Sequence, residues 1–322
     1  MPWRTKRSDG GWDAMSRAHP LSRDHVRARA IFNKDAFWWK PLPTSPPLAA
    51  NSASIVSGAL VPNIAGISLD RTSYTPQVAI ASNSDPVVTF TYDTATGYSE
   101  HPQLISGNLT GIRVPRTTVP AAGTDREVVV YNVDTKQYTD MWFATKVNDT
   151  NWTVGYAGTI QDASTSSGVH TAPFGATACG LAFLPGLVTP DDLAAGWIGH
   201  VVGIGLPKAC LNNQVSIPAN RTDGEGTGPN LVSEGQRLIL PRTLDIESLP
   251  ISRTAKIVAR AAQEFGLIVW DRGETSTTIR AVNATGMSVD PYPALLAGHE
   301  ANPLAGFPVA QLQVVAKDWM PA

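Results

Sequence analysis

The side chains most able to carry out chemistry are a pair of carboxylates and a histidine. Asp245 and Glu247 are two residues apart, so on a strand they would share one face. Glycoside hydrolysis requires two carboxyl groups facing one cleft, roughly 5–10 Å apart. His200, on a predicted strand, could be a general acid or base if a carboxylate or hydroxyl lay within hydrogen-bond reach. Both have structural alternatives, which we favour: the carboxylates can close a turn, and the histidine can cap a loop carbonyl.

Three further residues are candidates for ligand binding. His170 lies in the polar segment 164–171, which is expected to be a lid or a surface loop. Trp152 and Trp197 lie on or beside predicted core elements and are expected to be buried, as most tryptophans are. Any tryptophan that reaches the surface in a groove becomes a candidate for stacking against a sugar.

The two cysteines and the glycines point to no metal or phosphate chemistry. Cys179 and Cys210 flank a predicted helix and strand, so they could form a disulfide or remain as two buried thiols. No histidine stands at metal-binding spacing from them, and we predict no metal and no cofactor. The segment 224–228 is rich in glycine but lacks the lysine of a phosphate-binding loop, and no Gly-Xaa-Ser-Xaa-Gly motif is present.

The composition favours a turn-rich β protein. Of 322 residues, 43% are hydrophobic and only 16% are charged, and the chain has 27 Gly and 25 Pro. The net charge of −2 gives no overall basic surface for nucleic acid, and no apolar run is long enough to span a bilayer. Residues 1–34 form a basic N-terminal arm without the apolar core of a secretion signal, and it carries Arg4, Lys6, Arg7, Arg17, Arg23, Arg27 and Arg29.

Alternating and β-branched segments predict most of the strands. Residues 127–133 and 138–144 should form a hairpin, followed by a third strand at 152–158. Strands are also predicted at 198–206 and 237–240, and 267–270 should pair with 277–282 through a turn at 271–274. Start and stop signals predict short helices at 189–196 and 252–265. We therefore expect one large β-rich domain over 35–322, an antiparallel two-sheet sandwich of jelly-roll type with two short helices and an extended arm.

Several ordered motifs carry a resemblance to a known family. They are the segments 125–131 and 137–142, the run Cys179–Val201, and the helix-to-strand unit Ala259–Asp271. Together they resemble an uncharacterised family of bacterial secreted and surface proteins, which is also similar to minor tail proteins of actinobacterial phages. Since the chain shows no export signal, the resemblance implies a phage virion protein, assembled in the host cytoplasm and acting outside the cell.

The resemblance leaves three functions open. The first is a tail or tail-tip protein that attaches to a host surface glycan, in contact with copies of itself and other virion proteins. The second is a polysaccharide-active hydrolase or lyase. The third is a capsid decoration protein, with the basic arm clamped onto a neighbouring subunit. No nucleic-acid or membrane partner is expected for any of them.

Overall fold

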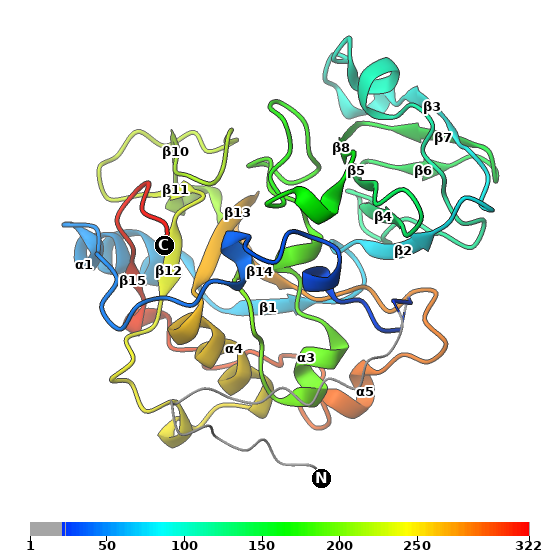
Figure 1. Cartoon of the computed structure of the whole chain (residues 1–322). Coiled ribbons are helices and arrows are strands. Elements are labelled where there is room, and N and C mark those ends of the chain that lie inside the picture. Colours follow the sequence, from blue (N-terminus) through cyan, green and yellow to red (C-terminus); the bar gives the residue numbers. More distant parts are fainter. Residues whose placement is uncertain (1–20, 23, 322) are drawn as a thin grey trace.

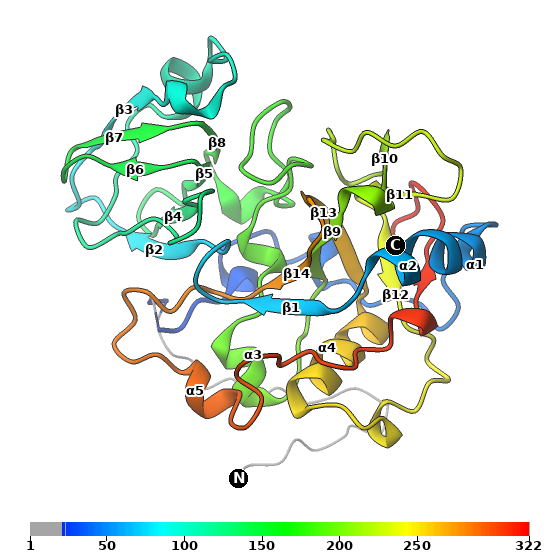
Figure 2. The same cartoon turned by 180° about the vertical axis from the view of Figure 1, so that it is seen from behind.

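The computed structural model describes residues 21, 22 and 24–321, and it is built mainly from strands in mixed sheets with a few short helices. Figures 1 and 2 show two units side by side. The larger unit contains a six-stranded sheet with helices on it, and the smaller unit, in cyan and green, contains the strands between residues 77 and 160.

The six-stranded sheet forms the body of the larger unit. Its strand order is β1-β14-β9-β13-β12-β15. The strands β1 and β14, and β9 and β13, pair in parallel, whereas the other neighbours are antiparallel. Their bounds are Ile67–Asp70 (β1), Val202–Pro207 (β9), Arg237–Ile239 (β12), Leu267–Gly273 (β13), Thr277–Arg280 (β14) and Gln313–Val314 (β15). A two-stranded parallel sheet of β10 (Leu211–Val215) and β11 (Val232–Glu234) lies beside them.

Both predicted helices of the larger unit are confirmed, and their caps explain their bounds. The helix α3 (Pro190–Ala195) begins with a capping box in which Thr189 and Asp192 bond to each other's backbone N–H. It ends at Gly196, whose φ of 76° favours glycine. The helix α4 (Arg253–Glu264) is capped by the Ser252 hydroxyl, which accepts from Ala255 N, and its apolar stripe packs on the sheet. The remaining α-helices of the described residues are α1 (Ser52–Ile55), α2 (Val61–Asn63) and α5 (Tyr292–Leu295), and the other helical segments are short 3-10 or π turns.

Two small sheets form the smaller unit. One has the order β2-β4-β5-β8 and the other β3-β7-β6. Their bounds are Gln77–Ala81 (β2), Thr89–Tyr92 (β3), Val128–Asn132 (β4), Tyr138–Trp142 (β5), Thr145–Lys146 (β6), Asn151–Val154 (β7) and Tyr156–Ile160 (β8). The predicted hairpin at β4 and β5 is confirmed as an antiparallel pair. The strand predicted at 152–158 is instead two strands in different sheets, which separate at Gly155, where a Cβ atom would lie 2.8 Å from Phe143 Cβ.

The antiparallel jelly roll predicted from the sequence is not confirmed, because the sheets are mixed. β2 pairs with β4 in parallel, and so do β3 with β7 and β1 with β14. The hairpin predicted between 267–270 and 277–282 is wrong, because β9 lies between β13 and β14 and pairs with both. The alternation of side chains marks a strand but says nothing about the direction of its neighbour.

A shared hydrophobic cluster joins the two units, and we call it the seam cluster. It contains Val129 and Tyr138 from the smaller unit and Val201, Ile268 and Trp270 from the larger one. The chain from residue 26 to residue 39 runs through it, and its buried side chains are Val26, Ala28, Ile31, Phe32, Ala36, Phe37, Trp38 and Trp39. The described part of the predicted arm therefore packs onto the body, whereas Arg4, Lys6, Arg7, Arg17 and Arg23 lie outside the described residues.

The helices of the described residues are all short. None has both the length and the apolar character that crossing a bilayer would require.

Candidate functional site

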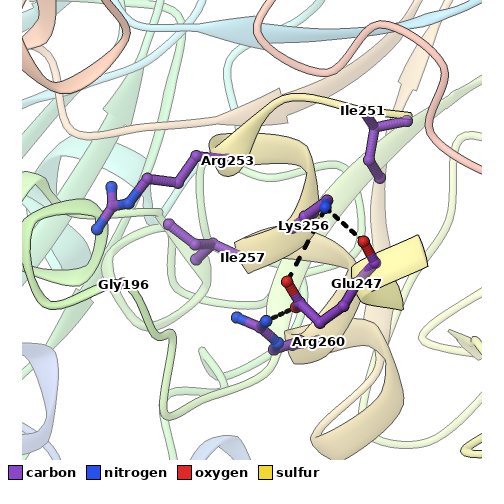
Figure 3. A pocket seen from close by; sticks show the side chains of 7 residues that line it. All are labelled: Gly196, Glu247, Ile251, Arg253, Lys256, Ile257 and Arg260. Atoms are coloured by element: carbon purple, nitrogen blue, oxygen red, sulfur yellow. Dashed lines mark hydrogen bonds and ion pairs between the residues drawn. The ribbon is translucent and has the colours of Figure 1, made fainter. Parts of the chain in front are cut away.

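The paired carboxylates predicted from the sequence do not face one cleft. Asp245 caps a single 3-10 turn, Ile246–Ser248, and its carboxylate accepts from Glu247 N at 3.0 Å. Glu247 points toward α4, where it pairs with Arg260 and lies 3.9 Å from Lys256 Nζ (Figure 3). The structural alternative, a turn before the helix, therefore accounts for Asp245, and Glu247 belongs to a separate pocket.

His200 braces the start of α3. Its Nδ1 lies 2.8 Å from Val201 O and its Nε2 lies 3.4 Å from Asp192 Oδ2, the carboxylate of the capping box. Burial lowers the pKa of His200, but the hydrogen bond and charge of Asp192 outweigh it, so the pKa is raised overall. Since Asp192 is already engaged by Thr189 at 2.6 Å, the histidine has a structural partner on each ring nitrogen.

His170 is buried, so the prediction of a lid or surface loop around it is wrong at this residue. Its Nε2 lies 2.9 Å from Asp140 Oδ2, and Asp140 also accepts from the Tyr138 hydroxyl and from the backbone N–H of Ala176 and Phe183. A buried carboxylate with this many partners ties β5 to the loop that follows β8. The polar composition of the segment indicated exposure, but His170 is buried because it is a hydrogen-bond partner of the buried Asp140 carboxylate.

The two candidate tryptophans have different surroundings. Trp152 is only 1% exposed in the core of the smaller unit, which removes it from any surface that a sugar could stack on. Trp197 is half-buried against Phe265, and its indole N–H donates to Glu264 at 3.0 Å.

The two cysteines are free and buried. They lie in different hydrophobic clusters, Cys179 in the seam cluster and Cys210 in the core of the six-stranded sheet. Burial raises the pKa of both thiols, that of Cys210 to about 11, which keeps them protonated and unreactive near neutral pH.

A set of five carboxyl groups stands where the two units meet, and three of them, Asp125, Glu127 and Asp271, interact with Arg280, whereas Asp223 and Glu234 interact with each other and with Asp271; we call this set the Arg280 cluster. Arg280 ends β14, and its Nη1 lies 2.6 Å from Asp271 Oδ2 while its Nη2 lies 3.8 Å from Glu127 Oε1. Asp125 and Glu127 come from the segment before β4, and Asp271 comes from β13. Asp223 lies between β10 and β11, and Glu234 is the last residue of β11.

The inner members of the Arg280 cluster are short of partners. Glu127 is 1% exposed, and neither of its carboxyl oxygens has a hydrogen-bond partner among the described residues. Burial, opposed by Arg280 and helped by Asp125, raises the pKa of Glu127 to about 8. Burial and the charge of Asp223 likewise raise the pKa of Glu234 to about 8. Both groups are therefore largely protonated at neutral pH.

The outer members of the Arg280 cluster reach solvent. The Asp271 side chain is 18% exposed, Asp125 is half-buried and Asp223 is exposed. Burial and then the charge of Asp271 raise the pKa of Asp125, against the opposing charge of Arg280. A carboxyl group that keeps its proton to higher pH thus stands near a carboxylate that is ion-paired to an arginine, which is the kind of contrast that acid and base roles require.

Aromatic rings extend the Arg280 cluster across the smaller unit. Phe143 N donates to Asp125 O at 2.6 Å, and the centroid of the Trp142 ring lies 5.2 Å from that of Phe143 and 6.4 Å from that of Tyr98. Trp142 and Phe143 are half-buried and Tyr98 is 73% exposed. We refer to Tyr98, Trp142, Phe143, Asp125 and Asp271 together as the aromatic–acidic surface.

Two of the four non-glycine residues with positive φ in the described part of the chain lie at or beside this surface, and the others are Lys136 and Asp318. Arg126 and Phe143 have φ values of 46° and 58°, in the left-handed region that residues other than glycine rarely adopt. The two face each other, because Ala144 N donates to Arg126 O and the Arg126 guanidinium lies 3.6 Å from the Phe143 ring centroid. Strain of this kind persists where the surroundings hold it, and such positions gather at functional sites.

Sequence reasoning missed the aromatic–acidic surface because its members come from distant segments. The one local signal was the placement of Asp125 just before a predicted strand and of Asp271 just after another, since strand ends commonly carry functional side chains. No group of three or more His, Cys, Asp or Glu within the described residues is arranged to hold a metal ion, so the Arg280 cluster is not a metal centre of that kind.

Comparisons with known proteins add no assignment. No protein-family model matches the chain, and neither the curated proteins nor the solved structures gave a significant match. The functional conclusion therefore depends on the geometry of the Arg280 cluster and its aromatic neighbours.

Proposed function

We propose that the chain binds a glycan at the aromatic–acidic surface. The observation that carries this proposal is the backbone hydrogen bond from Phe143 N to Asp125 O at 2.6 Å, which places the half-buried rings of Phe143 and Trp142 beside the half-buried Asp125. Sugars offer apolar C–H faces that stack on aromatic rings and hydroxyl groups that donate to carboxylates. Tyr98 and Trp142 can supply the stacking, and Asp125, Asp223 and Asp271 can accept from hydroxyl groups.

Affinity electrophoresis in gels containing host envelope polysaccharide tests the proposal. Trp142→Ala should weaken binding by about tenfold, corresponding to ~1.4 kcal/mol, because a stacking ring is lost. Trp319→Ala is the matched control, since Trp319 is also half-exposed but lies on the larger unit near β12. Equal mobility shifts for the two variants would count against the aromatic–acidic surface.

Hydrolysis of the bound glycan is a second candidate function, favoured by the contrast between Asp125 and Asp271. Asp125, with its raised pKa, would donate its proton to the leaving glycosidic oxygen. Asp271, ion-paired with Arg280, would take a proton from the attacking water. The water oxygen then bonds to the anomeric carbon as the glycosidic C–O bond breaks.

Reducing-end release from the polysaccharide distinguishes binding from hydrolysis. Asp125→Asn and Asp271→Asn should each lower the release by at least about a hundredfold if hydrolysis occurs, while both should still bind. Asp245→Asn is the matched control, because Asp245 only caps a turn on the far side of the larger unit. No release by the unaltered protein, together with intact binding, would leave glycan attachment as the function.

We also propose, from the resemblance of the sequence, that this surface acts on a phage virion as part of a tail or tail tip. Several copies would then multiply a modest affinity through their effective concentration. Antibody to this chain should label the tails of intact virions in negative-stain images. Label on the capsid would favour the decoration role instead, and unlabelled particles would count against any virion role.

A further inference from the structure

A pocket lies on the outer side of α4, away from the Arg280 cluster. Its volume is about 290 Å³, near the lower end for small-molecule sites. Figure 3 shows Arg253 of α4 on one side of it and Lys256, Arg260 and Glu247 together on the other side, with Ile257 between them and Ile251 at the edge. α4 precedes β13, whereas Asp271 lies toward the other end of that strand, and Figure 1 shows α4 on the side of the larger unit away from the smaller unit.

The charges in this α4 pocket are unbalanced. Arg253, Lys256 and Arg260 follow one face of the helix at spacings of three and four residues, and Glu247 is the one carboxylate among the lining residues. The first turn of α4 holds no acidic residue, although that end of a helix favours negative charge. Placing Arg253 and Lys256 there disfavours the helix unless an anion offsets them.

In the structure, the Glu247 carboxylate is the anion that offsets the cations of α4. It pairs with Arg260, and Lys256 Nζ lies 3.9 Å from its Oε2. Its side chain is 60% exposed and stands on a single 3-10 turn rather than on the packed face of a long element. Such a carboxylate has little packing to hold it, so a stronger anion can replace it on the two cations.

Arg253 approaches from the other side of the pocket. One of its N–H groups donates to Leu193 O at 2.8 Å, near the end of α3. A guanidinium group carries five N–H donors in a fixed fork, so this bond leaves others for a ligand. Lys256 also donates to Glu247 O at 2.7 Å, which holds the ammonium group at the edge of the pocket.

We propose that the α4 pocket binds a tetrahedral oxyanion, phosphate or sulfate, which displaces the Glu247 carboxylate from Arg260 and Lys256. Three cationic side chains on different sides suit an anion with several equivalent oxygens better than a planar carboxylate. The volume leaves room for a substituent, so the anion can be a group carried on a larger molecule. This site is independent of the glycan surface proposed above.

Equilibrium dialysis with labelled inorganic phosphate and with sulfate, at constant ionic strength set by chloride, tests the proposal. Arg260→Gln and Lys256→Gln should each weaken phosphate binding by about tenfold. Glu247→Gln should strengthen it by about threefold or more, because the competing carboxylate is gone. Glu300→Gln is the matched control, an exposed carboxylate elsewhere, and should leave binding unchanged.

The opposite sign of the Glu247 and Arg260 variants makes the test decisive. If Glu247 only braces the helix, Glu247→Gln will lower the thermal midpoint without any gain in phosphate affinity, and the proposal is then wrong. Binding of a phosphodiester polymer with no binding of inorganic phosphate or sulfate would also contradict it. Trp142→Ala should leave phosphate binding intact, so failure of the glycan proposal is distinguishable from failure of this one.

Discussion

The Arg280 cluster and the α4 pocket are opposite arrangements of the same charges. In the first, three carboxyl groups interact with an arginine that is largely buried, and in the second, cations line a pocket with one exposed carboxylate. Burial makes the first a place where protonation states change, with the pKa of Glu127 and Glu234 near 8. Exposure makes the second a place where ions exchange, because water and salt screen its charges. Whether a charged group changes its protonation state or exchanges ions thus depends on its burial as much as on the sign of its charge.

The largest expected difference between the two regions is in the cost of removing their arginines. Arg280→Met should lower the free energy of unfolding by about 3–5 kcal/mol, because it leaves the largely buried Asp271 carboxylate without the cation that lies 2.6 Å from it. Arg260→Met should cost less than about 1 kcal/mol, because its partner Glu247 is solvated. Urea unfolding at pH 7 measures both values, and similar losses would break the comparison.

A smaller difference is expected in the pH dependence of stability. The pKa of Glu127 is about 8 in the folded protein against 4.5 as its ordinary value, so the folded state keeps a proton that the unfolded state has released. The contribution of this retained proton to the free energy of unfolding is complete below pH 4.5 and is lost as the pH rises from there through about 8.

Glu127→Gln stays neutral over the whole range, so relative to the unaltered protein it should gain on the order of 1–3 kcal/mol in unfolding free energy between pH 4.5 and 8. Glu247→Gln is the comparison variant and should show no such trend. Urea unfolding at several pH values measures the two slopes, and parallel curves for the unaltered protein and Glu127→Gln would show that Glu127 is solvated.

The smallest effect is expected from salt. Raising the ionic strength from about 0.1 M to 1 M shortens the screening length from about 10 Å to about 3 Å. Phosphate affinity at the α4 pocket should then fall severalfold. The stability difference between Glu127→Gln and the unaltered protein should change little, because Glu127 is buried. Dialysis and urea unfolding at the two salt concentrations separate these responses.

The parts of the fold that were predictable from the sequence are those whose causes are local. Thr189 and Ser252 act as helix caps within four residues of the groups that they bond, so both helices could be placed in advance. The hairpin of β4 and β5 likewise depends on one short turn. By contrast, β9 enters the sheet between β13 and β14, and no local pattern at 267–282 encodes that insertion.

The candidate site was predictable in even smaller part. Asp245 and Glu247 are close in sequence, yet one caps a turn and the other pairs with α4. Asp125 and Asp271 are far apart in sequence, and only the packing of the smaller unit on the larger one brings Asp271 near enough to raise the pKa of Asp125. Spacing in the chain finds partners along one element, whereas sites between elements require the tertiary structure.

The path of residues 26–39 through the seam cluster has a consequence for biosynthesis. Trp38 O accepts from Val201 N, and Arg237 donates to Phe37 O, so this early segment is held by strands that leave the ribosome much later. Its tryptophans stay exposed until β9 and β12 have been synthesised. During that period a chaperone or a neighbouring nascent chain can bind them. The native packing of residues 26–39 is therefore completed only after the strands that follow them in the chain, β9 and β12, have been made.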